Sequence, residues 1–165
     1  MPRRLGLMAA FLAAPLFVPT AHAGDSSGFD PASIDQCLAA ADSQGARADC
    51  AGTGMDACIA YATSKYTGGD TTFPQSNCID ASHQAWEAKL TQTYDELLTA
   101  QGAKGIKPQE MLRQTERSWI QFRDDLCHQM QESAGEAAGA LANARCIRDE
   151  TARQVALLLT LGQQE

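Results

Sequence analysis

Apolar residues recur at intervals of three and four in three long stretches of the second half of the chain. Each stretch forms one stripe, and two of the stripes also include a threonine. The three stripes are Ile79, Trp86, Leu90, Tyr94, Leu97 and Leu98; Leu112, Thr115, Trp119, Phe122, Leu126 and Met130; and Leu141, Ala144, Ile147, Thr151, Val155 and Leu158. Such spacing places each set on one face of an α-helix. No segment shows the alternation of apolar and polar residues that is typical of a β-strand. The pattern predicts an all-α fold.

Glycine, proline and capping residues set the expected ends of these helices. The first is expected to begin at Cys78, with Asn77 as its cap, and to end at Gly102. Pro108 can open the second helix, and the third is expected to follow Gly139. Connections this short make consecutive helices antiparallel neighbours. We therefore expect a small antiparallel bundle of three long helices.

The first half of the chain predicts only short helices. One should open at Asp30-Pro31, a capping residue followed by a first-turn proline, and stop at Gly45. Another is expected from about Gly54 to Ser64, where apolar residues again share one side. One or two short helices should therefore precede the bundle.

A stretch rich in glycine and small polar residues, Tyr66 to Asn77, separates the two halves. It could be a mobile binding loop, but loops more often only connect, and we favour a connection. We accordingly divide the chain into a cysteine-rich extension, 24–77, and a helical domain, 78–165.

Residues 1–23 have the order of a secretory signal peptide. Arg3 and Arg4 precede an apolar run, and Ala21-His22-Ala23 forms a small-x-small cleavage site. The run is too short to span a membrane. We expect cleavage near Ala23 and a periplasmic or secreted protein without a membrane anchor in the mature chain.

Six cysteines follow this segment, and an even number in an exported chain predicts three disulfides. Cys127 and Cys146 lie on consecutive predicted helices joined by a short Gly/Ala-rich turn, so an antiparallel pair can bring them together. The sequence does not choose among the three pairings of the others, which are Cys37, Cys50, Cys58 and Cys78. The absence of a CxxC motif argues against a zinc ribbon or a thioredoxin-type site.

The chain is acidic, with a net charge of −7, and loss of the signal segment would remove two arginines and no acidic residue. Nucleic acids bind through Lys and Arg, so this charge disfavours a nucleic-acid partner and an anionic membrane. It favours a cationic partner, although plain solubility explains it equally well.

Motifs of common enzyme classes are absent: there is no GxSxG, no HExxH and no phosphate-binding glycine loop. His83 and His128 stand singly on polar helix faces, and Cys78 with His83 has no usual metal spacing. Trp86 and Trp119 lie on the apolar stripes, which favours a role in the core over ligand binding. We expect no catalytic residue, no metal and no cofactor.

Two conspicuous segments, W-x-x-F-R-D-x-x-C and a cysteine followed by L-x-x-x-Y-x-x-L, carry a resemblance to a known family. The residues concerned are Cys78, Trp86, Leu90, Tyr94 and Leu97; Leu112, Arg117, Trp119, Phe122, Arg123, Asp124 and Cys127; and Cys146, Thr151, Arg153 and Leu157. From Cys78 to about Leu159 the chain resembles the LprI-type lysozyme inhibitors. Thr91 stands where that family usually has Asn, and Glu116 where Gln is usual.

Arg123 and Asp124 follow Trp119 closely and flank its apolar stripe. We favour an ion pair that ties helices together over a ligand site for Arg123. Arg153 invites the same interpretation, with Asp95 or Glu116 as its acidic partner.

The resemblance implies a protein partner, and the acidic charge fits a cationic lysozyme. The leading hypothesis is a secreted or periplasmic lysozyme inhibitor that docks through its acidic surface. The alternative is a non-inhibitory structural or stress-related module of the cell envelope that binds an unknown ligand.

Overall fold

The computed structural model describes residues 27–163, and the expected signal peptide lies outside this range. Its elements are α1 (Ala32–Ala40), α2 (Gln44–Ala48), the 3-10 helix η1 (Asp49–Gly52), α3 (Met55–Lys65), α4 (Phe73–Lys104), α5 (Ile106–Ala134) and α6 (Glu136–Gln163). Residues 27–163 contain no strand, so the predicted all-α class is confirmed. No helix in this range is both long and apolar enough to cross a membrane.

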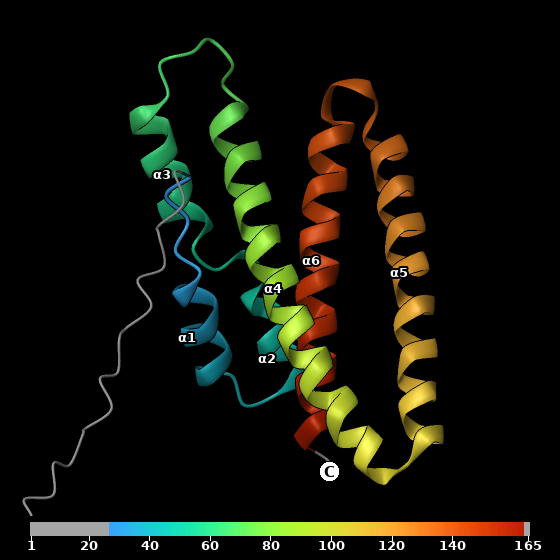
Figure 1. Ribbon diagram of the computed structural model, residues 1–165. Helices are drawn as coiled ribbons and strands as arrows, with labels where there is room; N and C mark the ends of the chain where they lie inside the picture. The colour runs from blue at the N-terminus through green and yellow to red at the C-terminus, as the bar shows by residue number, and fades with distance from the viewer. Residues whose placement is uncertain (1–26, 164–165) are drawn as a thin grey trace, which may run out of the picture.

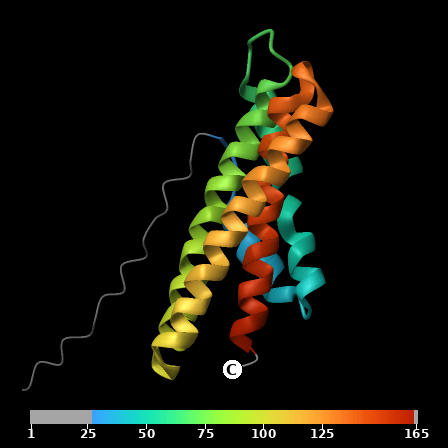
Figure 2. The ribbon, with the colours of Figure 1, turned by 90° about the vertical axis from the view of Figure 1, so that its right-hand side faces the viewer.

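Three long helices form the bundle, each antiparallel to the next along the chain (Figures 1 and 2). The last of them, α6, packs against both α4 and α5. Consequently α6 is buried on most of its sides, and residues such as Thr151, Val155 and Leu158 are at most 1% exposed. The short helices α1 and α3 lie on the side of α4 away from α5 (Figure 1).

Three disulfides hold these elements together. Cys37–Cys50 joins α1 to η1, Cys58–Cys78 joins α3 to α4, and Cys127–Cys146 joins α5 to α6. The last pair is the one expected from the helical hairpin. Cys58–Cys78 and the buried Trp86, whose indole N–H donates to the Ala51 carbonyl oxygen at 3.3 Å, fasten the N-terminal elements to the long helices.

Several expected helix ends are wrong. Gly45, Gly102 and Gly139 lie inside helices, and α4 begins at Phe73, so the connection before it is shorter than Tyr66 to Asn77. The breaks fall instead at Gly105 and Gly135, whose φ values of 131° and 76° favour glycine. Gly139 serves packing, because a Cβ atom there would lie 2.8 Å from the backbone oxygen of Gln131 on α5.

The stripe expected on α5 is also wrong in part. Phe122 and Met130 are 56% and 47% exposed, and Thr115 is exposed as well. Their expected inward places are taken by polar residues, since Glu116 is 8% exposed and the Arg123 side chain 15%. Polar side chains can hold interior positions when other groups of the chain bind them, and apolar periodicity does not detect such positions.

Candidate functional site

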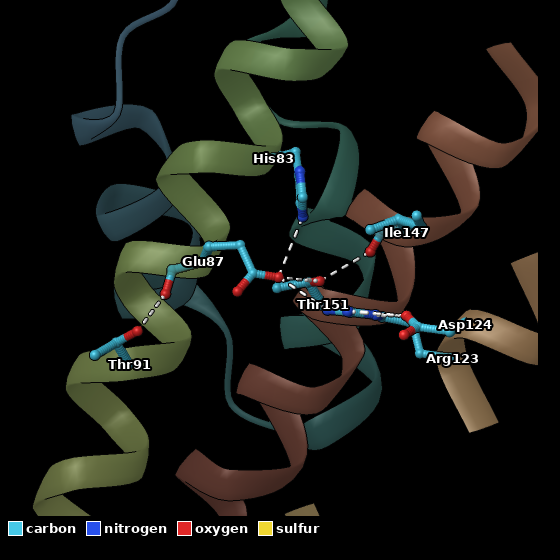
Figure 3. A network of polar contacts seen from close by, with 7 residues as sticks. All are labelled: His83, Glu87, Thr91, Arg123, Asp124, Ile147 and Thr151. Atoms are coloured by element: carbon cyan, nitrogen blue, oxygen red, sulfur yellow. Dashed lines mark hydrogen bonds and ion pairs between the residues drawn. The ribbon is translucent and has the colours of Figure 1, made fainter. Parts of the chain in front are cut away.

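One carboxylate oxygen of Glu87 on α4 links the three long helices (Figure 3). This Oε1 atom lies 2.9 Å from Nη1 of Arg123 on α5 and 3.2 Å from Oγ1 of Thr151 on α6. Nε2 of His83, one turn earlier on α4, lies 3.1 Å away. The His83 and Glu87 side chains are 30% and 40% exposed, so the network sits at the edge of the core. Sequence analysis missed Glu87, because only the packing brings it opposite Arg123.

The Arg123 guanidinium is occupied by groups of its own chain. Besides Glu87, it contacts Oδ1 of Asp124 through Nε at 3.0 Å and Nη2 at 2.9 Å. It also lies 5.0 Å from the centre of the Trp119 ring, a cation–π distance. These contacts are those of an ion pair that ties helices together.

Arg153 does not form the expected link between helices. It is exposed and pairs with Glu150 on its own helix, not with Asp95 or Glu116. The partner that α6 supplies to Glu116 is Gln154, whose Nε2 donates to Oε1 at 2.5 Å. Thr151 and Gln154 face the core at this level of α6, which turns Arg153 to solvent.

Motif residues of α4 and α5 meet along a groove of about 330 Å³, which we call the α4–α5 groove. Its lining comprises Leu90, Thr91, Tyr94, Arg113, Glu116, Arg117, Trp119 and Ile120. The two arginines stand one helical turn apart, and both contact Glu110: Nη1 of Arg113 at 3.5 Å and Nη2 of Arg117 at 3.1 Å. Arg113 was missed by sequence analysis, although its i, i+4 spacing from Arg117 is visible there. The groove thus combines apolar side chains with an arginine pair that is bound to Glu110.

Burial raises the pKa of Glu116 above its ordinary value, and the hydrogen bond from Gln154 opposes this only in part. The ionised carboxylate is therefore less stable at this position than it is in water. A Gln at this position would keep the oxygen that accepts from Gln154 without the charge.

Replacing Glu116 with Gln is expected to raise the free energy of unfolding at pH 7 by about 1 kcal/mol, because the amide keeps the bond from Gln154 and avoids burying a charge. Because the folded-state pKa is the higher one, wild-type stability falls as pH rises from the unfolded value of about 4.3 through the folded value. The difference should vanish below pH 4, where the carboxyl is neutral in both states.

Urea unfolding between pH 3.5 and 8 measures this difference. Glu96→Gln, an exposed change on α4, is the control and should show no such pH dependence. An E116Q protein less stable than wild type at pH 7 would contradict the expectation.

The loop between α3 and α4 and the turn between α5 and α6 lie at the same end of the bundle (Figures 1 and 2). Asp70 in the loop and Glu132 and Glu136 at the turn are exposed. Hydrogen bonds from the hydroxyl and backbone N–H of Thr72 lower the pKa of Asp70, so it stays ionised. We call this region the acidic end.

Within residues 27–163, no group of three or more His, Cys, Asp or Glu side chains is placed to hold a metal ion.

The sequence profile of a protein family described as lysozyme inhibitor LprI matches residues 58–158. The chain belongs to the LprI family. Comparison with curated proteins and with solved structures finds no match.

The LprI match begins at Cys58, twenty residues before the expected resemblance. It therefore includes most of α3, the Cys58–Cys78 disulfide and all of α4 and α5, whereas α1 and α2 precede it. Thr91 and Glu116, the two positions at which the sequence resemblance is expected to be imperfect, both line the α4–α5 groove.

Proposed function

We propose that this LprI protein binds and inhibits a cationic lysozyme. The LprI match, described as a lysozyme inhibitor, carries the proposal. The net charge of −7 supports it, because opposite charge steers two proteins together. Three disulfides fit a periplasmic or extracellular location, where lysozymes act.

The acidic end is the proposed docking surface. Its two connections are each fastened by a nearby disulfide, Cys58–Cys78 for the loop and Cys127–Cys146 for the turn. At the two ends of the loop, the rings of Tyr66 and Phe73 stack with their centres 4.5 Å apart. A preorganised surface loses little conformational entropy on binding. The loop and turn would together cover the substrate cleft of the enzyme.

Mature protein added in equimolar amount is expected to stop the lysis of bacterial cell walls by a cationic lysozyme. Inhibition should weaken as salt rises, since screening shortens the reach of exposed charges. Lysis that continues under a large excess, over several lysozyme classes, would contradict inhibition and favour the envelope-binding alternative. The protein alone should release no cell-wall fragments.

Charge changes at the acidic end test the docking surface. The double variant Glu132→Lys with Glu136→Gln is expected to weaken inhibition about tenfold, because complementary charges across an interface raise the association rate and fix the orientation of the two proteins. Asp95→Lys with Glu96→Gln changes the net charge equally on exposed positions farther along α4, and should weaken inhibition less than about threefold. Equal losses in the two variants would mean that overall charge, not this end, determines binding.

A further inference from the structure

We propose that the α4–α5 groove binds the carboxyl-terminal residue of a peptide or protein partner when that residue is large and apolar. The groove is lined by the apolar side chains of Leu90, Trp119 and Ile120 together with Arg113 and Arg117. This combination matches a carboxylate next to an apolar side chain. It does not involve the acidic end and does not depend on lysozyme inhibition.

The arginine pair already holds one carboxylate. Oε2 of Glu110 lies 3.5 Å from Nη1 of Arg113, and its Oε1 lies 3.1 Å from Nη2 of Arg117. The Glu110 side chain is 58% exposed, so the carboxylate can leave without opening the core. A ligand carboxylate can take its place, since guanidinium groups bind carboxylates with favourable geometry.

The apolar part of the ligand would lie against Ile120, which is 45% exposed, and the half-buried Trp119. The Tyr94 side chain is half-buried beside them. Burial raises the Tyr94 pKa, and its neutral hydroxyl can donate a hydrogen bond. Pockets for small molecules usually enclose most of their ligand, whereas these partly exposed side chains leave one side open. An open groove of this kind suits the end of a longer chain.

Other charges around the groove set its selectivity. Glu116 lies in the lining but is 8% exposed and bonded to Gln154, whereas the arginines stand at the rim with side chains 37% and 57% exposed. Glu110 offsets one of the two arginine charges, and Asp95 acts on Tyr94 together with both arginines. A ligand carboxylate would therefore bind at the rim by replacing Glu110 on the arginine pair, away from the buried Glu116.

The test compares N-acetyl-Ala-Phe having a free carboxylate with the same dipeptide as its carboxyl-terminal amide. Binding is followed by NMR shifts of the Trp119 indole and by titration calorimetry of the mature protein. The acid should bind roughly fivefold more tightly than the amide, the scale of one charged contact at a partly exposed site. Equal affinities would overturn the proposed role of the arginine pair.

Two variants should move affinity in opposite directions. Arg117→Gln should bring the acid down to the affinity of the amide, whereas Glu110→Gln should raise the affinity for the acid about threefold, because it removes the competing carboxylate. Arg145→Gln, an exposed change on α6, is the control and should leave affinity unchanged. No binding of either dipeptide to wild type or to E110Q would overturn the proposal, and lysozyme inhibition would be untouched by that result.

Discussion

Replacing Trp86 with alanine is expected to lower the free energy of unfolding by about 3–5 kcal/mol, which is a large share of the total free energy of unfolding of a domain of this size. Trp86 is fully buried, so alanine would leave a cavity where α4 meets the N-terminal elements. The change also removes the donor to Ala51 and leaves that carbonyl oxygen without this partner.

Urea unfolding with the disulfides intact measures the effect. Trp86→Phe keeps most of the buried apolar volume and loses the indole N–H, so it should cost roughly 1–2 kcal/mol. A loss below about 1 kcal/mol in the alanine variant would contradict the central packing role of Trp86. Losses of equal size in both variants would mean that the hydrogen bond, not packing, dominates.

Removal of the Cys58–Cys78 disulfide by two alanine substitutions is expected to cost about 3 kcal/mol, the chain-entropy value for a loop of this length. Both sulfurs are fully buried, and the sequence separation is 20 residues. Alanine is preferred to serine because a buried hydroxyl would need a partner. Without the bond, α3 should open more readily, and its amide hydrogens should exchange faster.

Removal of Cys127–Cys146 is the matched control, because its sequence separation of 19 residues predicts nearly the same entropic cost. In that variant fast exchange should appear near the α5–α6 turn, while α3 keeps its protection. If α3 exchanged equally in both variants, Cys58–Cys78 would not be what holds α3 to the bundle.

The polar interior shows where prediction from sequence stops. The sequence singled out Arg123 and favoured an ion pair, but it could not name Glu87, which lies on a different helix 36 positions away. For Arg153 the same reasoning failed, since that residue faces solvent and pairs with Glu150. Which polar residue faces inward depends on the rotation of each helix about its axis, and an apolar stripe fixes this rotation only approximately. The exposed Phe122 reflects the same limit.

The sequence by itself determined the all-α class, the three long helices and the disulfide in the helical hairpin, because these depend on local periodicity and on neighbours along the chain. Tertiary structure decided the pairing of the other four cysteines, since contacts between distant segments choose among pairings that spacing alone leaves equal. It also decided the helix ends: α4 continues past Gly102, and Gly139 stays helical because its lack of a side chain lets α6 pack closely against Gln131 of α5. The α4–α5 groove arises for the same reason, since its two walls come from separate helices and exist only once these are packed.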